Sequence, residues 1–328
     1  MTEFNKPPRE TNADGDPRRV GVELEFAAVS ATDAAGIVRS AFGGTIERVN
    51  QHKFKISDTA LGDFEAELDW QFLHDGEDEG ASEEDARSKK TDFQDAFRGV
   101  LGDVAATIVP CEIVCPPVTL SELHRLDALL ADLRKLGAQG TTANPLYAFG
   151  AQLNPEIAEK SAAYIVSVLK AYLLVSDWLR AVISLDLTRR VLTYTDPFPV
   201  DYVLKVVDPG YWPDMEDLID DYLRHNPVRN RELDMLPLFS WLDRSRVQAV
   251  MSDARVKSRP TFHYRLPDTR LDRPDWTVAT EWNRWCVVER LAERRDKLEA
   301  MARAYKENQA HLVSKDWAIL ASEWLAMP

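Results

Sequence analysis

The sequence predicts an α+β fold, in which helices pack on one side of a sheet. Strand-like alternation of apolar and polar residues recurs through the first half of the chain, whereas the second half has mostly helical apolar spacing. The chain has 328 residues, of which 45% are apolar, which is ample for a hydrophobic core.

The first strand is predicted at residues 19–26, which read Arg-Val-Gly-Val-Glu-Leu-Glu-Phe. Alternate residues of a strand share a face, so the apolar residues point to the core while Glu23 and Glu25 point into the same space. Two carboxylates directed together repel each other unless a cation lies between them. A cation site is one interpretation, and a solvated strand face that protects a sheet edge is the other.

The following elements are predicted in chain order. A short helix capped by Thr32 or Asp33 ends at Gly43 and Gly44. Strands are expected at 45–49, 53–57, 63–72, 108–114, 147–153 and 261–266. A helix is expected at 92–104. An amphipathic helix is expected to begin after a capping box at Thr119 and Glu122 and to end at Gly137. One long terminal helix is expected to contain Trp282, Trp285, Leu298 and Tyr305.

A second acidic strand face is predicted at residues 63–72, where Glu65, Glu67 and Asp69 alternate with apolar residues. Glu112 lies inside another predicted strand. The acidic segment 74–90 has no periodicity and is expected to be a mobile, solvated insert, whose acids are not expected to be catalytic.

The chain is expected to form a flexible leader at 1–18 and a single catalytic domain at 19–328, sheet-rich over 19–158 and helix-rich over 159–328. Segment 162–185 is apolar enough to raise the question of a membrane span. Lys170, Asp177 and Arg180 interrupt it, which favours a buried central helix.

Composition narrows the function and the compartment. A net charge of −14 opposes binding to nucleic acid or an anionic membrane. The three cysteines, without CxxC spacing, suggest neither a disulfide framework nor a zinc site, and a reducing cytoplasm is expected. A cysteine nucleophile, such as Cys115 with His124 or Cys111 with His263, is disfavoured because free cysteines most often pack in cores.

Several short motifs occur in a particular order. The motifs follow one another along the chain at Gly21 to Phe26, Lys55 to Leu61, Cys111 to Pro117, Phe149 to Asn154 and Phe262 to Arg265. Together they resemble the amidoligase family of the glutamate-cysteine ligase and glutamine synthetase superfamily. Each motif is short, and the order of all five is what carries the resemblance.

The resemblance implies an α+β fold in which a curved, mainly antiparallel sheet forms a funnel-like site with helices packed outside. It also implies a ligase that uses ATP and Mg²⁺ to activate a carboxylate as an acyl phosphate, which an amine then attacks. The expected substrates are an amino-acid or peptide carboxylate and an amine acceptor, which includes peptide or protein substrates. Oxygen-rich sites suit Mg²⁺ bound to phosphates, and the absence of a glycine-rich phosphate loop is consistent with such a site. By resemblance, the metal ligands are Glu23, Glu25, Glu65, Glu67 and Glu112; the catalytic residues are Arg265, Asp58 and Glu112; and the cofactor contacts are Gln152, Asn154, His263 and Arg265.

Two positions depart from the family pattern. Gln152 stands where relatives often have a histidine, and His263 stands where they commonly have Glu or Gln. An amide is a weaker metal ligand, so a metal position is lost or rebuilt. The alternative is therefore a catalytically inactive module that binds a peptide or nucleotide.

Overall fold

The computed structural model describes residues 3–68, 110–143, 149–183, 195–251, 253, 255–311 and 315–327. The predicted acidic insert at 74–90, the predicted helix at 92–104 and the end of the predicted strand at 63–72 lie outside the described residues.

Nine strands form one open sheet in the order β2-β3-β4-β5-β1-β7-β9-β8, with β6 paired to β1. All of their pairings are antiparallel, which confirms the α+β class and the antiparallel character of the sheet. The strands are β1 (Arg19–Phe26), β2 (Thr45–Arg48), β3 (Lys53–Thr59), β4 (Gly62–Leu68), β5 (Cys111–Val114), β6 (Val118–Thr119), β7 (Ala151–Pro155), β8 (Leu233–Asp234) and β9 (His263–Tyr264).

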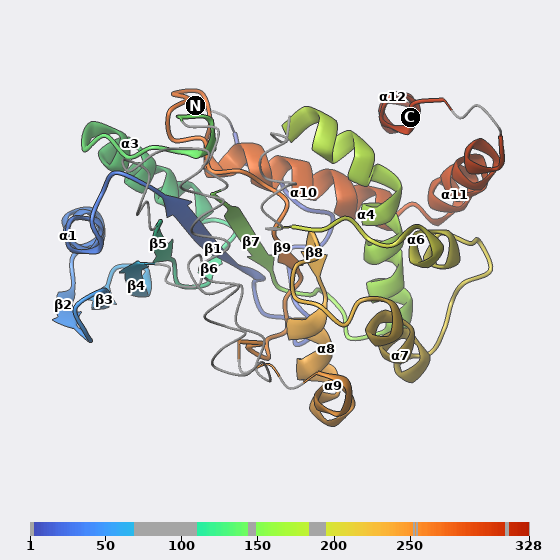
Figure 1. Cartoon of the computed structure of the whole chain (residues 1–328), viewed down its shortest axis with the longest axis horizontal. Helices are drawn as coiled ribbons and strands as arrows, with labels where there is room; N and C mark the ends of the chain where they lie inside the picture. Colours follow the sequence, from blue (N-terminus) through green and yellow to red (C-terminus); the bar gives the residue numbers. More distant parts are fainter. Residues whose placement is uncertain are drawn as a thin grey trace, which may run out of the picture.

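The helices at 31–42, 127–135, 162–183, 278–292 and 295–310 occupy ranges that the apolar spacing indicated, with shifted boundaries. The other helices of the described residues had no predicted range of their own. The described helices are α1 (Ala31–Phe42), α3 (Asp127–Lys135), α4 (Ala162–Ile183), α6 (Val200–Val206), α7 (Met215–His225), α8 (Leu236–Leu242), α9 (Arg244–Val250), α10 (Val278–Ala292), α11 (Arg295–Ala310) and α12 (Trp317–Ala326), with 3-10 turns η2 (Leu123–Leu126) and η3 (Thr141–Ala143). Figure 1 shows α10 and α4 beside the strands at the centre of the molecule, with α1 near the β2–β4 end.

Four local predictions were wrong. Ser30, not Thr32 or Asp33, caps α1, because its hydroxyl accepts the Asp33 amide hydrogen at 3.1 Å. The predicted terminal helix is two helices, α10 and α11, broken at Glu293 and Arg294. Thr119 belongs to β6, so its bond to Glu122 (Oγ1 to Oε2, 2.8 Å) precedes the helical turns instead of capping one. The strand predicted at 261–266 has only His263 and Tyr264 in strand conformation.

The segment expected to be a flexible leader is docked on the body from residue 3 onward. Arg18 is 1% exposed and forms two hydrogen bonds to the Glu289 carboxylate of α10, at 2.6 and 2.9 Å. Arg9 pairs with Glu293 and Glu159, and the Trp282 indole donates to the Asn5 carbonyl at 2.8 Å. These contacts explain why a polar, proline-containing segment is ordered.

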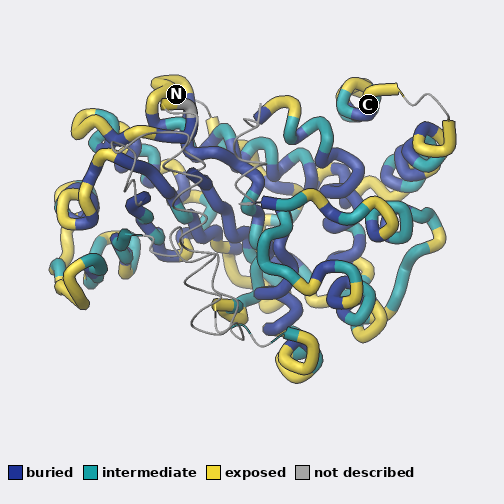
Figure 2. Tube along the Cα trace, in the orientation of Figure 1, coloured by how far each residue is buried: buried dark blue, intermediate teal, exposed yellow. Residues whose placement is uncertain are grey.

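The core lies on the apolar face of the sheet. Phe26 and Phe64 are fully buried, and the Phe64 ring stacks on Phe42 of α1 with centroids 5.3 Å apart. Trp285 of α10 packs on Tyr264 of β9 at 5.3 Å. Figure 2 shows the buried residues concentrated along the central strands and the exposed ones along the outer sides of α1 and α9.

Helix α4 is long and apolar enough to cross a membrane by length and composition, but 72% of its apolar window is buried inside the molecule. Its Tyr172 ring packs edge-on against Tyr264 of the sheet at 6.0 Å, and α10, α11 and α12 pack around it. This packing confirms the predicted buried central helix.

Candidate functional site

The polar face of the sheet carries a row of aligned charged residues. Strand pairing places Lys53 opposite Glu67, Glu67 opposite Glu112, and Glu112 opposite Glu25. Residues that are directly opposite in an antiparallel pair lie on the same face with Cβ atoms about 4.5–5.5 Å apart. A second row runs beside it, in which Glu65 and Glu23 each pair with Val114 and Glu23 also pairs with Gln152. We call these two rows the carboxylate face.

Glu25 is the most constrained acid of the carboxylate face. It is 2% exposed, its Oε1 accepts from Gln152 Nε2 at 2.9 Å, and its Oε2 accepts from the Gly150 backbone amide at 2.8 Å. Both donors belong to the chain around β7, which pairs with β1. Glu25 is thus held in one orientation by its neighbours.

The hydrogen-bond chain from Glu25 continues to β9 and β8. Gln152 Nε2 donates a hydrogen bond to the Glu25 carboxylate, so Gln152 Oε1 is left as an acceptor. This oxygen lies 2.7 Å from His263 Nε2. His263 therefore carries a proton on Nε2. Its Nδ1 faces Asp234 Oδ2 at 3.5 Å. The chain Asp234–His263–Gln152–Glu25 spans four strands.

Burial acts on His263 and Glu23 in opposite directions. Burial lowers the pKa of His263, against the hydrogen bond to Asp234 and the charge of Glu23, which both raise it. Burial raises the pKa of Glu23, but the electrostatic interactions with His263 and Arg259 and the hydrogen bond from the Asn154 amide outweigh it, so the pKa of Glu23 lies below its usual value. Glu23 is accordingly expected to be a carboxylate at neutral pH.

Glu23 Oε1 accepts from Asn154 Nδ2 at 2.8 Å and lies 3.5 Å from Arg259 Nη1. Gly21 lies opposite Asn154 in the register, and a Cβ at this glycine would come within 3.3 Å of the Asn154 Cβ. The glycine of the first motif therefore leaves space for the amide that holds Glu23.

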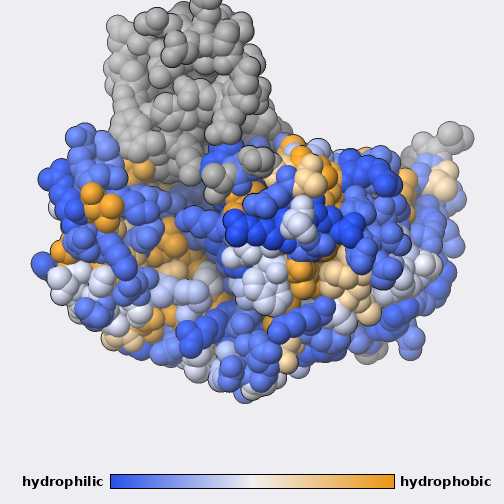
Figure 3. Space-filling model, turned by 90° about the horizontal axis from the view of Figure 1, so that it is seen from below, coloured by the Kyte–Doolittle hydropathy of each residue, from blue (hydrophilic) through white to orange (hydrophobic). Residues whose placement is uncertain are grey.

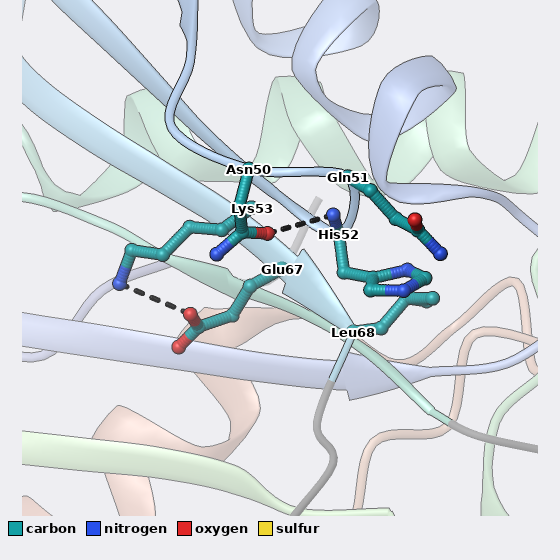
Figure 4. A pocket seen from close by; sticks show the side chains of 6 residues that line it. All are labelled: Asn50, Gln51, His52, Lys53, Glu67 and Leu68. Carbon is teal, nitrogen blue, oxygen red and sulfur yellow. Dashed lines mark hydrogen bonds and ion pairs between the residues drawn. The ribbon is translucent and has the colours of Figure 1, made fainter.

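Lys53 neutralises the far end of the carboxylate face. Its ammonium nitrogen lies 2.6 Å from Glu65 and 3.0 Å from Glu67. Figure 4 shows Lys53 directed toward Glu67 beside a cavity of about 470 Å³, which is lined by Asn50, Gln51, His52, Lys53, Glu67 and Leu68. Figure 3 shows that the side of the molecule seen from below is dominated by hydrophilic residues.

The predicted metal ligands share one face but do not converge into a ready-made cage. Within the described ranges, no group of three or more His, Cys, Asp or Glu side chains is placed to hold a metal ion. Lys53 pairs instead with Glu65 and Glu67. The Gln152 amide donates to Glu25, and the Asn154 amide donates to Glu23. Mg²⁺ commonly uses only one or two carboxylates together with water and substrate phosphates, so these hard oxygen donors fit Mg²⁺ bound to a nucleotide.

The other predicted site residues are placed as follows. Asp58 is exposed near the end of β3, where the pairing with β4 is irregular, with φ +60°, and its backbone amide donates to Asp63 at 3.2 Å. Arg265 follows β9, and its Nη1 donates to the Arg229 carbonyl. The charge of Arg265 also contributes to the lowered pKa of Glu23, which places it near the carboxylate face.

Cysteine chemistry finds no support in the site. Burial raises the pKa of the Cys111 thiol to about 12, and the pKa of the buried Cys115 thiol is raised as well. A buried thiol with a raised pKa is a weak nucleophile, which agrees with the core-packing interpretation.

Sequence reasoning missed Asp234, Lys53 and Arg229. Asp234 lies in a strand of only two residues, which is too short to show any periodicity. Lys53 had a usable signal, because Lys53 and Lys55 alternate with Phe54 and Ile56 and could have been matched to an acidic partner strand. Arg229 lies in a loop, where no local pattern indicated its neighbours.

Fold and site together define an α+β protein whose open antiparallel sheet carries a carboxylate-lined face. Residues 16–287 match the model of the family described as "Putative amidoligase enzyme". The match covers most of the chain and includes the carboxylate face, so the chain belongs to this amidoligase family. No curated protein and no solved structure matches the chain.

Proposed function

We propose that this protein is an ATP- and Mg²⁺-dependent carboxylate-amine ligase that forms an amide or peptide-like bond. The observation that carries the proposal is the aligned row Glu67–Glu112–Glu25, with Glu25 buried and fixed by two hydrogen bonds. Burying a carboxylate costs free energy unless its charge is used or paired, so a fixed, buried acid beside two further acids favours a cation-binding role.

The residues have the following roles in this proposal. Glu25, Glu112 and Glu23 would hold Mg²⁺, with Glu65 and Glu67 next in line because Lys53 pairs with both. When bound, Mg²⁺·ATP supplies the phosphoryl group and neutralises the charge of the phosphates. Arg265 would orient a phosphate or carboxylate through its fork of donors, and Asn154 and Gln152 would keep the acids in position.

In the proposed reaction, a substrate carboxylate oxygen takes the γ-phosphoryl group to give an acyl phosphate and ADP. The amine nitrogen then attacks the acyl carbon, phosphate leaves, and the amine loses one proton. Asp58 was expected near the amine; it is exposed near the end of β3 and stays a prediction for that role. The acid is an amino-acid or peptide carboxylate and the amine belongs to a small molecule, a peptide or a protein, in the cytoplasm.

The test compares wild-type protein with Glu25→Gln and with Glu47→Gln, a control at an exposed strand position. ADP release is measured with Mg²⁺, ATP and a panel of amino acids and amines, and thermal stability is measured with Mg²⁺ and a nonhydrolysable ATP analogue. We expect Glu25→Gln to lower turnover by about a hundredfold or more, since even outer-shell partners of a metal are typically worth about 10–100-fold. Normal turnover in this variant would refute the assignment of Glu25.

A second candidate is a non-catalytic module that binds a nucleotide or peptide. It is favoured by the ion pairs of Lys53 with Glu65 and Glu67 and by Gln152, which ties up one oxygen of Glu25. A magnesium-dependent rise in melting temperature with the ATP analogue, without ADP release for any substrate pair, would support this module over the ligase.

A further inference from the structure

A group of arginines lies beside the Glu23 end of the carboxylate face, opposite the end that Lys53 occupies. We call Arg229, Arg259 and Arg265 the arginine cluster. Arg229 comes from the loop between α7 and β8, Arg259 precedes β9, and Arg265 follows it. The Arg265 guanidinium donates to the Arg229 carbonyl, which joins the loop to the strand, and Arg259 approaches Glu23 at 3.5 Å.

Two of these guanidiniums are poorly satisfied by the described part of the protein. The side-chain partner of Arg229 there is Asp253, whose Oδ2 is 3.3 Å from Arg229 Nε, and Asp253 also pairs with Arg255 at 2.9 Å. The Arg259 Nε is buried without a hydrogen-bond partner among the described residues. A guanidinium has five N–H donors in a planar fork, so both side chains retain unused donors.

The charges around Arg229 are predominantly positive. Burial lowers the pKa of Arg229, and the positive charges of Arg255 and Arg265 lower it further, against the opposing effects of Asp253 and Asp234. This excess of positive charge occurs in a chain with a net charge of −14. A half-buried cation that is crowded by other cations, and whose donors are not all accepted by the described residues, is stabilised by an incoming anion.

We propose that Arg229 and Arg259, together with Arg265, form an anion-binding subsite for a phosphate or carboxylate group. The side chains of Arg229 and Arg259 are 20% and 28% exposed, so both are accessible to a ligand. Arg259 Nη1 lies 3.5 Å from Glu23 Oε1, and Arg265 Nη1 donates to the Arg229 carbonyl, so the subsite adjoins the carboxylate face. The arginine cluster at the Glu23 end of the carboxylate face would bind the anionic group of a ligand. The acids of the carboxylate face would bind the metal that the same ligand carries.

That the anion belongs to a ligase substrate rests on the proposed function, whereas the anion site itself does not. The probes are inorganic phosphate and succinate, each compared with sodium chloride at equal ionic strength. We expect phosphate or succinate to raise the melting temperature of the full chain in a saturable way, because a ligand that binds only the native state stabilises it.

The informative variants are Arg229→Gln and Arg259→Gln, with Arg229→Lys as a milder change that keeps the charge but loses the fork. Arg273→Gln is the matched control, since Arg273 also pairs with a single aspartate, Asp275, at 3.1 Å. We expect at least a tenfold weaker apparent affinity for the preferred anion in both glutamine variants, an intermediate loss in Arg229→Lys, and no change in the control.

An anion response that is absent from the wild type, or equal in the wild type and both glutamine variants, would overturn the subsite. A response to phosphate but not succinate identifies a phosphate site, and the reverse identifies a carboxylate site. Glu25→Gln separates the two proposals, because it should abolish nucleotide turnover and keep the anion response. If the wild type releases ADP but its anion response does not depend on Arg229, the subsite is refuted and the proposed ligase function is not.

Discussion

At the scale of single residues, the site depends on side chains that hold the acids as well as on the acids themselves. Glu25 receives one bond from a backbone amide and one from Gln152, and Gln152 is in turn oriented by His263. The glutamine at this position therefore has a defined structural role. It serves as a link that accepts from a histidine and donates to a carboxylate.

Replacing Gln152 by Leu should impair function more than stability. The variant keeps a similar volume but removes the donor to Glu25 and the acceptor from His263, leaving Glu25 free to turn. We expect an affinity for Mg²⁺ with the ATP analogue that is about 10–100-fold weaker, measured by titrating the melting temperature. Gln139→Leu, at an exposed position outside the site, is the control. Equal affinity in the Gln152 variant and the wild type would show that Glu25 does not need this link.

At the scale of elements, α4 shows how one buried cation affects the stability of a core helix. Lys170 is fully buried, donates to the Asp208 and Tyr211 carbonyls at 2.8 and 3.2 Å, and lies 4.2 Å from the centre of the Trp212 ring. Burial lowers its pKa to about 8 from an ordinary value of 10.5. The charged form of Lys170 is therefore disfavoured by folding.

The sign of the resulting pH dependence follows from proton binding. Between pH 8 and 10.5 the unfolded state binds more protons at Lys170 than the native state does, so this residue makes the free energy of unfolding rise with pH through that window. Lys170→Met should flatten the slope, measured by urea unfolding at several pH values. Lys205→Met, which removes the charge of a partly exposed lysine of α6, is the control for the loss of one positive charge. An unaltered slope in Lys170→Met would contradict the lowered pKa.

At the scale of the whole molecule, the N-terminal segment ties the sheet to α10. Arg18 precedes β1, and its bidentate pair with Glu289 is almost completely buried, with exposures of 1% and 3%. The Trp285 indole also donates to Glu289 at 2.7 Å, so the pair belongs to a wider buried network. This network joins residues 271 positions apart in the sequence.

Arg18→Met should destabilise the protein strongly, because it leaves the Glu289 carboxylate buried without its cation. Removal of one partner of a buried pair typically costs about 3–5 kcal/mol. Chemical denaturation of this variant and of Arg9→Met, whose side chain is 39% exposed, gives the comparison. A loss of less than about 1 kcal/mol, as for an exposed pair, would show that the pair contributes little.

Local sequence patterns determined the strand alternation of residues 19–26, the acidic face of residues 63–68, the buried helix at 162–183 and the order of motifs that indicates an amidoligase. Each of these depends on periodicity within a few residues, which fixes the face on which a side chain lies. The tertiary structure decided which strands are neighbours and in what register. Only that register aligns Glu67, Glu112 and Glu25 and brings Asp234, Lys53 and Arg229 to the site, because these contacts join distant segments whose pairing no local periodicity specifies.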